Sequence, residues 1–393
     1  RKTRHHQRLS MQHGRGANRV VTRNPMSRFP IMKAKFPDPS LNPRQISSHL
    51  ARHLKKLRAG DGSVDLPEEA KEERKWPVDG EEDQRIRLSM NDMKRVDCHA
   101  ARLHDGILRR TGLSHLDRED RQKLSSLKNG VAMARISSLD HADELVARLH
   151  GEMPWMAPAT EHAWHAMRRS VREGWAGFRM SPVILERPPG IGKTYWMRRL
   201  GELIGTAKVD VDATGENASF GVVGCQRGWS SARPGRVLEC IMARQTGNPI
   251  VMIDELEKAG SAKSGRNQSF SLAEALLPLL ESSTAADWSC PYYRVRFDMS
   301  HVSWIMLTNN LSPLPEPLLN RCTILRMKEI DLPDLIVLAR REGQARGLAE
   351  ASVWSVTEAL SKAAPAAPSR PSLRTVLRML DRAEDLENRP IST

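Results

Sequence analysis

The sequence predicts an α/β fold in which a parallel sheet is covered by helices and followed by a small α-helical domain. Short apolar runs of strand length occupy residues 182–186, 208–212, 249–254 and 301–308. Turns or amphipathic segments flank each run, and buried parallel strands typically read as continuous apolar stretches. After residue 328 the apolar residues return to helical spacing and no further strand run follows, which predicts the helical domain.

Length and composition exclude several other classes of protein. The chain has 393 residues, of which 39% are hydrophobic, and this is enough for two or three packed regions. No stretch approaches the roughly 18 consecutive apolar residues that a membrane-spanning helix needs. The five cysteines are scattered and form no Cys-x-x-Cys pair, so neither a disulfide scaffold nor a cysteine zinc site is expected. We expect a cytoplasmic protein without membrane contact.

Charge, composition and the spacing of apolar residues divide the chain into regions. Residues 1–82 form a basic arm and linker that we expect to be mostly disordered, because residues 1–60 hold fifteen Lys or Arg and one acid, Asp38. Only residues 45–58 have the pattern of a short basic helix. The further expected regions are a helical segment at 83–139, the α/β domain at 140–328, the helical domain at 329–385 and a tail at 386–393.

A glycine-rich loop follows the first strand run and precedes a helix that begins near Lys193. Glycines let backbone N–H groups close around phosphate oxygens, and the helix N-terminus adds partial positive charge. The Lys193 side chain is expected to reach the β- and γ-phosphates of a nucleotide, and the Thr194 hydroxyl is expected to hold Mg²⁺. The expected binding residues are Pro188, Pro189, Gly190, Ile191, Gly192, Lys193, Thr194 and Tyr195.

The loop departs from the usual pattern at one position. In the motif G-x-x-x-x-G-K-T the first glycine would fall at position 187, where this chain has Arg187. An arginine there can strain the loop or place a guanidinium near the phosphates. We expect nucleotide binding to tolerate this change better than turnover does.

Two acids stand at the end of the strand run at 249–254, one as its last residue and one directly after it. Asp254 and Glu255 would lie at the carboxyl edge of the sheet, where α/β proteins place their chemistry. Asp254 is expected to order the water shell of Mg²⁺, and Glu255 to polarise the attacking water as a general base. Together with the loop, this pair predicts an ATP-hydrolysing site.

Several segments in order resemble the ATPase module of Lon-type AAA+ proteins, a P-loop family. They are GCQRGWSSARPGRV (224–237), NPIVMIDELEKAG (248–260), ALLPLLESS (275–283), YRVRFDMSHV (293–302) and LPEPLLNRCTILRM (314–327). The resemblance covers about residues 140–385. It implies that Asn309 is the sensor-1 residue that positions water, that Arg321 is the arginine finger, and that Arg374 is the sensor-2 arginine of the lid.

The same resemblance implies how the protein works. AAA+ modules assemble as rings, usually hexamers, and an arginine finger acts on the ATP of the neighbouring subunit. Trp229 takes the place of the pore-loop aromatic that grips a protein substrate, so remodelling or unfolding of a protein is the expected work. A Lon protease carries its peptidase after the lid, whereas about twenty residues follow Arg374 here. We therefore expect no peptidase on this polypeptide.

Two other functions remain open. Arg187 favours a nucleotide-dependent scaffold that binds ATP but turns it over poorly. The basic residues 1–60 suggest a DNA-associated ATPase, since Lys and Arg neutralise phosphates without regard to sequence. Residues 1–60 have only Phe29 and Phe36 as aromatics for base stacking, so any such binding is expected to be sequence-independent and salt-sensitive.

Overall fold

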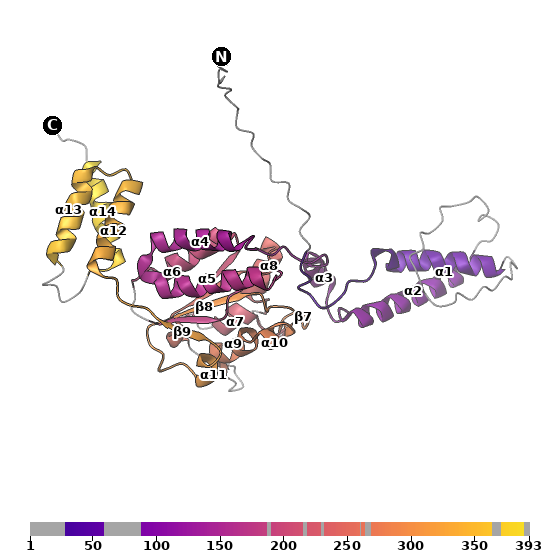
Figure 1. Cartoon of the computed structure of the whole chain (residues 1–393). Helices are drawn as coiled ribbons and strands as arrows, with labels where there is room; N and C mark the ends of the chain where they lie inside the picture. The colour runs from indigo at the N-terminus through magenta and orange to yellow at the C-terminus, as the bar shows by residue number, and fades with distance from the viewer. Residues whose placement is uncertain are drawn as a thin grey trace, which may run out of the picture.

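The computed structural model of the chain describes residues 28–58, 88–186, 190–214, 218–228, 232–259, 261–263, 269–363 and 371–388. Within these residues a central sheet carries helices on both faces, and a separate group of helices lies at each end (Figure 1). No helix in this part of the chain is long and apolar enough to cross a membrane. The expectations for Arg187, Pro188, Pro189 and Trp229 fall outside the described residues.

The central sheet has five strands, all parallel, in the order β2-β3-β8-β1-β9. Val183 of β1 lies opposite Ile305 of β8 on one side and Thr323 of β9 on the other. The sheet confirms the α/β fold and the four strands expected from the apolar runs. The strands are β1 (Val183–Glu186), β2 (Lys208–Asp212), β3 (Ile250–Asp254), β8 (Ser303–Thr308) and β9 (Thr323–Arg326).

The fifth strand, β9, was not predicted from the sequence. It lies at the edge of the sheet, and three of its four residues are exposed. An edge strand pairs on one side only and is not enclosed by helices, so its side chains need not form an apolar run. Arg326 illustrates this, because its Nε donates to the Glu186 carboxylate of β1 at 3.0 Å while most of the side chain faces solvent.

Both faces of the three inner strands, β3, β8 and β1, are buried, and this is why these strands read as continuous apolar runs. In β3, Ile250 and Met252 join one hydrophobic core, and Val251 and Ile253 join the other. The first core is completed by α4 (Leu139–Glu152), α5 (Ala157–Arg172) and α6 (Lys193–Ile204). The second is completed by α7 (Ala218–Val223), α8 (Arg236–Arg244) and α9 (Leu272–Leu280).

Short elements connect these helices and strands, and several of them carry residues of interest. The 3-10 turn η2 (Pro154–Met156) joins α4 to α5, η3 (Leu256–Lys258) follows β3, and α11 (Glu316–Leu319) precedes β9. The others are β4 (Ser261–Lys263), β5 (Ser269–Ser271), α10 (Ser282–Ala285), β6 (Trp288–Ser289) and β7 (Arg296–Phe297).

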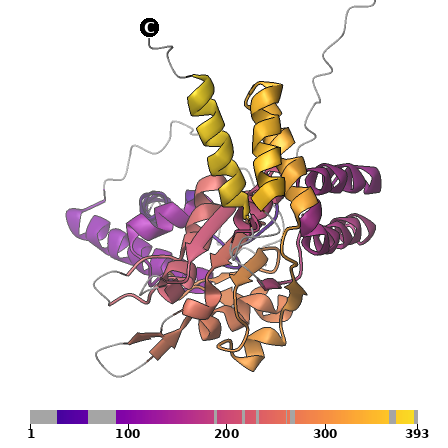
Figure 2. The same ribbon diagram turned by 90° about the vertical axis from the view of Figure 1, so that its left-hand side faces the viewer.

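Three helices after the sheet form the expected helical domain, which stands beside the sheet domain (Figures 1 and 2). They are α12 (Leu332–Ala345), α13 (Glu350–Ala363) and α14 (Leu373–Glu387). Asp331 caps α12 by accepting from the Asp334 N–H. Gly343 lets α12 and α13 approach closely, because a Cβ there would lie 2.6 Å from Cγ2 of Val353.

The described part of the N-terminal region contains η1 (Pro39–Leu41), α1 (Pro43–Arg58), α2 (Met90–Thr111) and α3 (Arg118–Ser125). Helix α1 confirms the short basic helix expected at 45–58. Residues just before it pack on the body of the protein, since Phe29 pairs with Val131, Met32 pairs with Phe297 and Ile31 is fully buried. These contacts are made to distant segments, so local composition could not indicate them.

Candidate nucleotide-binding site

The described end of the loop between β1 and α6, residues 190–192, contains two glycines in the left-handed region of the backbone. Gly190 and Gly192 have φ values of +92° and +85°, a region that strains any residue with a side chain. Gly192 is the N-cap of α6, and no described side chain forms a capping hydrogen bond at that end. The first N–H groups of α6 can therefore serve an anion at the helix N-terminus.

Trp155 in η2 holds the middle of this loop. Its indole Nε1 donates to the carbonyl oxygen of Ile191 at 2.9 Å, and the side chain is half-buried. Sequence analysis did not single out Trp155, because a lone tryptophan between two helices belongs to no recognisable motif. The contact ties the loop to the layer formed by α4 and α5.

The helical domain lies directly against the loop. A Cβ added at Gly192 would lie 2.9 Å from Cδ1 of Leu373, and one at Gly190 would lie 3.5 Å from Cβ of Ser372. Both contacts come from the start of α14. Gly192 therefore serves two purposes, since it permits the positive φ and leaves room for the Leu373 side chain.

Lys193 is the first residue of α6 and is only 8% exposed. Burial lowers its pKa, while the charges of Asp254 and Glu257 act in the opposite direction. A buried ammonium group is costly unless it has anionic partners. Bound phosphates would add further anionic partners and would stabilise the charged form of Lys193.

The two acids predicted from the sequence occupy the carboxyl end of β3, as expected, but they differ in environment. Asp254 accepts the backbone N–H of Glu255 at 2.9 Å. Glu255 has a positive φ of 52°, a conformation that costs a non-glycine residue about 1 kcal/mol or more. The Glu255 carboxylate pairs with the Lys258 ammonium at 2.7 Å. Glu255 is thus held by a neighbouring lysine in this structure.

Glu257 is a site residue that sequence reasoning missed. Its carboxylate accepts from Thr308 Oγ1 at 2.8 Å and from Asn309 Nδ2 at 2.9 Å. Burial tends to raise the pKa of Glu257, but these and backbone hydrogen bonds outweigh burial and keep that pKa below its usual value. The carboxylate links the end of β3 to the end of β8 and fixes the Asn309 amide. Glu257 is the second Glu of the segment Asp-Glu-Leu-Glu, so the sequence did contain a signal for it. It was missed because an acid at that place is also common in the first turn of a helix.

Replacing Glu257 with Ala is therefore expected to lower ATP turnover by about 10²-fold, because misplacing a catalytic group by about 1 Å has that effect. The KM for ATP should change little, since Glu257 does not line the cavity described below. Steady-state kinetics measures kcat and KM. The kcat of Glu257→Gln, which keeps one acceptor oxygen, should lie between those of the parent chain and Glu257→Ala. Glu274→Gln, an exposed acid on α9, is the control. A rise in KM with unchanged kcat would contradict this role.

The three residues assigned by resemblance lie in different places. Asn309, at the end of β8, and Arg374, the second residue of α14, both line the cavity described below. Arg321 does not line it. Its Nη1 donates to the Pro317 carbonyl at 2.9 Å, and its Nε lies 3.6 Å from a carboxylate oxygen of Glu281. Arg321 is therefore separate from the cavity of its own chain.

A cavity of about 420 Å³ brings the predicted residues together between the sheet domain and the helical domain. This is within the range typical of small-molecule sites. The loop and helix α6 supply one wall, the ends of β3 and β8 the floor, and α12 and α14 the opposite wall. The lining includes Met153, Trp155, Gly190, Gly192, Lys193, Thr194, Tyr195, Asp254, Glu255, Asn309, Leu338, Arg341, Arg374 and Leu377.

The lining suits a magnesium nucleotide. Thr194 offers a hydroxyl and Asp254 a carboxylate, the oxygen ligands that Mg²⁺ prefers beside substrate phosphates. No cluster of three or more His, Cys, Asp or Glu occurs among the residues that the structure describes. The apolar side chains Met153, Leu338 and Leu377 leave room for a base at the other end.

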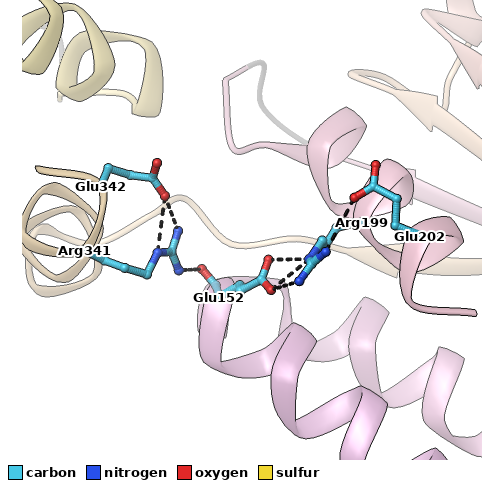
Figure 3. Close-up of polar contacts among 5 residues, drawn as sticks. All are labelled: Glu152, Arg199, Glu202, Arg341 and Glu342. Carbon is cyan, nitrogen blue, oxygen red and sulfur yellow. Dashed lines mark hydrogen bonds and ion pairs between the residues drawn. The ribbon is translucent and has the colours of Figure 1, made fainter. Parts of the chain in front are cut away.

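Polar contacts connect the helical domain to the helix that follows the loop (Figure 3). Arg341 of α12 donates to the backbone carbonyl of Glu152 at the end of α4 and pairs with Glu342 at 2.8 Å. The Glu152 carboxylate accepts Nε of Arg199 on α6 at 2.8 Å, and Arg199 also pairs with Glu202 at 3.5 Å. The position of α12 is thereby coupled through α4 to α6.

Comparison with known proteins agrees with this geometry. Residues 183–330 match the family model described as "ATPase family associated with various cellular activities (AAA)". The "Lon protease homolog, mitochondrial" of Phaeodactylum tricornutum is 29% identical over 178 residues, which are 45% of this chain and 20% of that protein. The "Lon protease" of Chlamydia pneumoniae is 31% identical over 165 residues, or 42% of this chain and 20% of that protein.

The fold and the matched segment define residues 183–330 as an AAA ATPase domain. The relatives narrow the assignment within the AAA family, because the domain is related to the ATPase region of Lon proteases. The chain spans about a fifth of the length of these curated relatives. The resemblance drawn from the sequence motifs is thus confirmed for the ATPase region.

Proposed function

We propose that this chain binds ATP with Mg²⁺ in the cavity between the sheet domain and the helical domain, and hydrolyses it. One observation carries the proposal. Lys193, Asp254, Asn309 and Arg374 are far apart in the sequence, yet all line the same cavity. Random surface positions would not converge in this way, and these residue types suit a triphosphate, its metal and its attacking water.

Each residue then has a definite task. The backbone N–H groups from Gly190 to Thr194 and the Lys193 ammonium bind the phosphates, and Thr194 and Asp254 hold Mg²⁺ or its water shell. Glu255 accepts a proton from the attacking water, which the Asn309 amide orients. Pro188 and Pro189 complete the loop in the proposed set, and Tyr195 lines the cavity. Arg374 approaches the phosphates from the helical domain and helps to close that domain over the nucleotide.

Binding is tested with Lys193→Ala. Removing a charged hydrogen-bonding partner of phosphate should weaken nucleotide binding by about 10²-fold. Calorimetric titration of the full chain with a non-hydrolysable ATP analogue and Mg²⁺ measures this affinity. Lys123→Ala, on the exposed face of α3, is the matched control and should bind as the parent chain does. Equal affinity of Lys193→Ala and the parent chain would remove the basis of the proposal.

We further propose that the chain acts as a ring of identical subunits, a hexamer by analogy with AAA+ modules, and that ATP hydrolysis remodels a protein substrate. Arg321 supports the ring, because it lies outside the cavity of its own chain and retains an exposed guanidinium. The relation to the ATPase region of Lon proteases supports a protein substrate, with the segment around Trp229 as its contact. A cytoplasmic location belongs to the same proposal.

A second candidate function is a nucleotide-dependent scaffold with slow turnover. The observation that favours it is the ion pair between Glu255 and Lys258, since the ammonium occupies a carboxylate oxygen that a general base would have to present to water. Phosphate release measured at saturating ATP separates the two functions. Release that is no faster from the parent chain than from Glu255→Gln would favour the scaffold.

A further inference from the structure

A hairpin of two helices, α1 and α2, stands away from the sheet domain (Figure 1). The helices run antiparallel, since Arg58 at the end of α1 pairs with Asp92 near the start of α2 at 2.7 Å. No residue of α1 is buried, and only Val96, Ala100 and Leu108 of α2 are. Two isolated helices cannot enclose both of their apolar stripes, so part of each stripe remains uncovered.

The uncovered apolar surface is concave. A groove of about 440 Å³ lies between the first half of α1 and the second half of α2. Its apolar lining consists of Leu41, Ile46, Leu50, Leu103 and Ile107, and Ser40, Gln45, His49 and Arg52 line it as well. Leu103 remains 43% exposed and Leu41 39% exposed. A groove of this kind accepts side chains that project from one face of a third helix.

The charge of the hairpin selects among possible occupants. Helices α1 and α2 contain ten Lys or Arg and three Asp. Two of the three acids already have partners, because Asp92 pairs with Arg58 and Asp97 accepts from Ser47 Oγ at 2.5 Å. The two helices therefore carry a net charge of about +7, with Arg52 at the groove itself, and they attract negative charge.

We propose that this groove, defined by Leu41, Ile46, Leu50, Leu103 and Ile107, binds an acidic amphipathic helix of a partner protein. Apolar side chains of that helix fill the groove, and its carboxylates face the basic rim that includes Arg52. A second copy of the hairpin is disfavoured because it carries the same charge. The two helices contain no Phe, Tyr or Trp for base stacking, and nucleic acid offers nothing to fill an apolar groove.

The test uses the full chain and a fluorescent designed peptide of about 18 residues, or about five helical turns, with Leu at helix-face spacing and Glu elsewhere. Binding is followed by fluorescence anisotropy. Leu103→Glu should weaken it by at least about tenfold, because the change places a carboxylate in the groove opposite an acidic helix. Met90→Glu is the matched control, since Met90 is an exposed apolar residue of the same helix outside the groove.

Two further measurements keep the proposal falsifiable. Arg52→Glu should weaken peptide binding and reduce its dependence on salt, while circular dichroism verifies that each variant keeps its helix content. A peptide with Lys in place of Glu should not bind. Equal binding of the Lys and Glu peptides, equal effects of Leu103→Glu and Met90→Glu, or tighter binding of a short DNA duplex or of phosphatidylserine vesicles would each overturn the proposal. None of these results depends on ATP hydrolysis.

Discussion

Replacing Arg321 with Ala is expected to lower ATP turnover by about 10³-fold or more, the effect of removing an arginine finger. The guanidinium lies outside the cavity of its own chain, and its partners among the described residues are the Pro317 carbonyl and the Glu281 carboxylate. In the proposed ring it would stabilise transition-state charge in the neighbouring subunit. Phosphate release at saturating ATP measures the loss, and nucleotide affinity of the isolated subunit should be unchanged.

A mixing experiment makes the prediction specific to action between subunits. Arg321→Ala and Glu255→Gln chains should each be nearly inactive alone, yet mixed rings contain sites in which one chain supplies Glu255 and its neighbour supplies Arg321. Turnover should therefore recover partly on mixing. Arg148→Ala, which removes an exposed arginine of α4 paired with Glu144 on the same helix, is the control. Full activity of Arg321→Ala, or no recovery in mixtures of two inactive chains that still assemble, would contradict action between subunits.

Glu255→Gln is expected to reduce turnover by about 10² to 10⁴-fold, the contribution typical of a general base. Nucleotide binding should be retained, because the substitution keeps the shape of the side chain and leaves Lys193 and Thr194 untouched. The variant should therefore trap bound ATP. Pre-steady-state phosphate release and nucleotide affinity, measured on the same preparation, separate the two steps.

The pairing of Glu255 with Lys258 adds a condition to this prediction. A general base must present its carboxylate to water, so Glu255 has to leave Lys258 during turnover. Lys258→Ala should then keep or raise the turnover of the parent chain, and it should have no effect in the Glu255→Gln background. If Lys258→Ala lowered turnover as strongly as Glu255→Gln does, the lysine would be a participant rather than a restraint on Glu255.

Motif reasoning located most of the candidate site because the relevant residues stand beside local signals. Gly190, Gly192 and Lys193 follow a strand and begin a helix, and Asp254 ends an apolar run. Such signals depend on nearest neighbours in the chain, so they can be read without coordinates. The roles of these residues remain proposals that the kinetic variants test.

Other site residues had no local signal. Trp155 matters because its indole reaches the Ile191 carbonyl, and Glu257 matters because it holds Thr308 and Asn309 across two strands. Neither partnership joins residues that are close in sequence. The edge strand β9 escaped prediction for a related reason, since its exposure removes the apolar pattern while its pairing with β1 is invisible in the sequence.

Local patterns were sufficient to predict the α/β sheet, the trailing helical domain and the kinship with the Lon ATPase region, all of which are confirmed, while the phosphate loop after the first strand stays a prediction. They were sufficient because apolar periodicity and glycine placement are properties of short segments. Only the tertiary structure shows that α14 contacts the loop and that Lys258 pairs with Glu255. It also shows that Arg321 lies outside the cavity of its own chain and that α1 and α2 leave a basic groove. These features arise from contacts between segments distant in the chain, whose geometry is set by packing rather than by local preference.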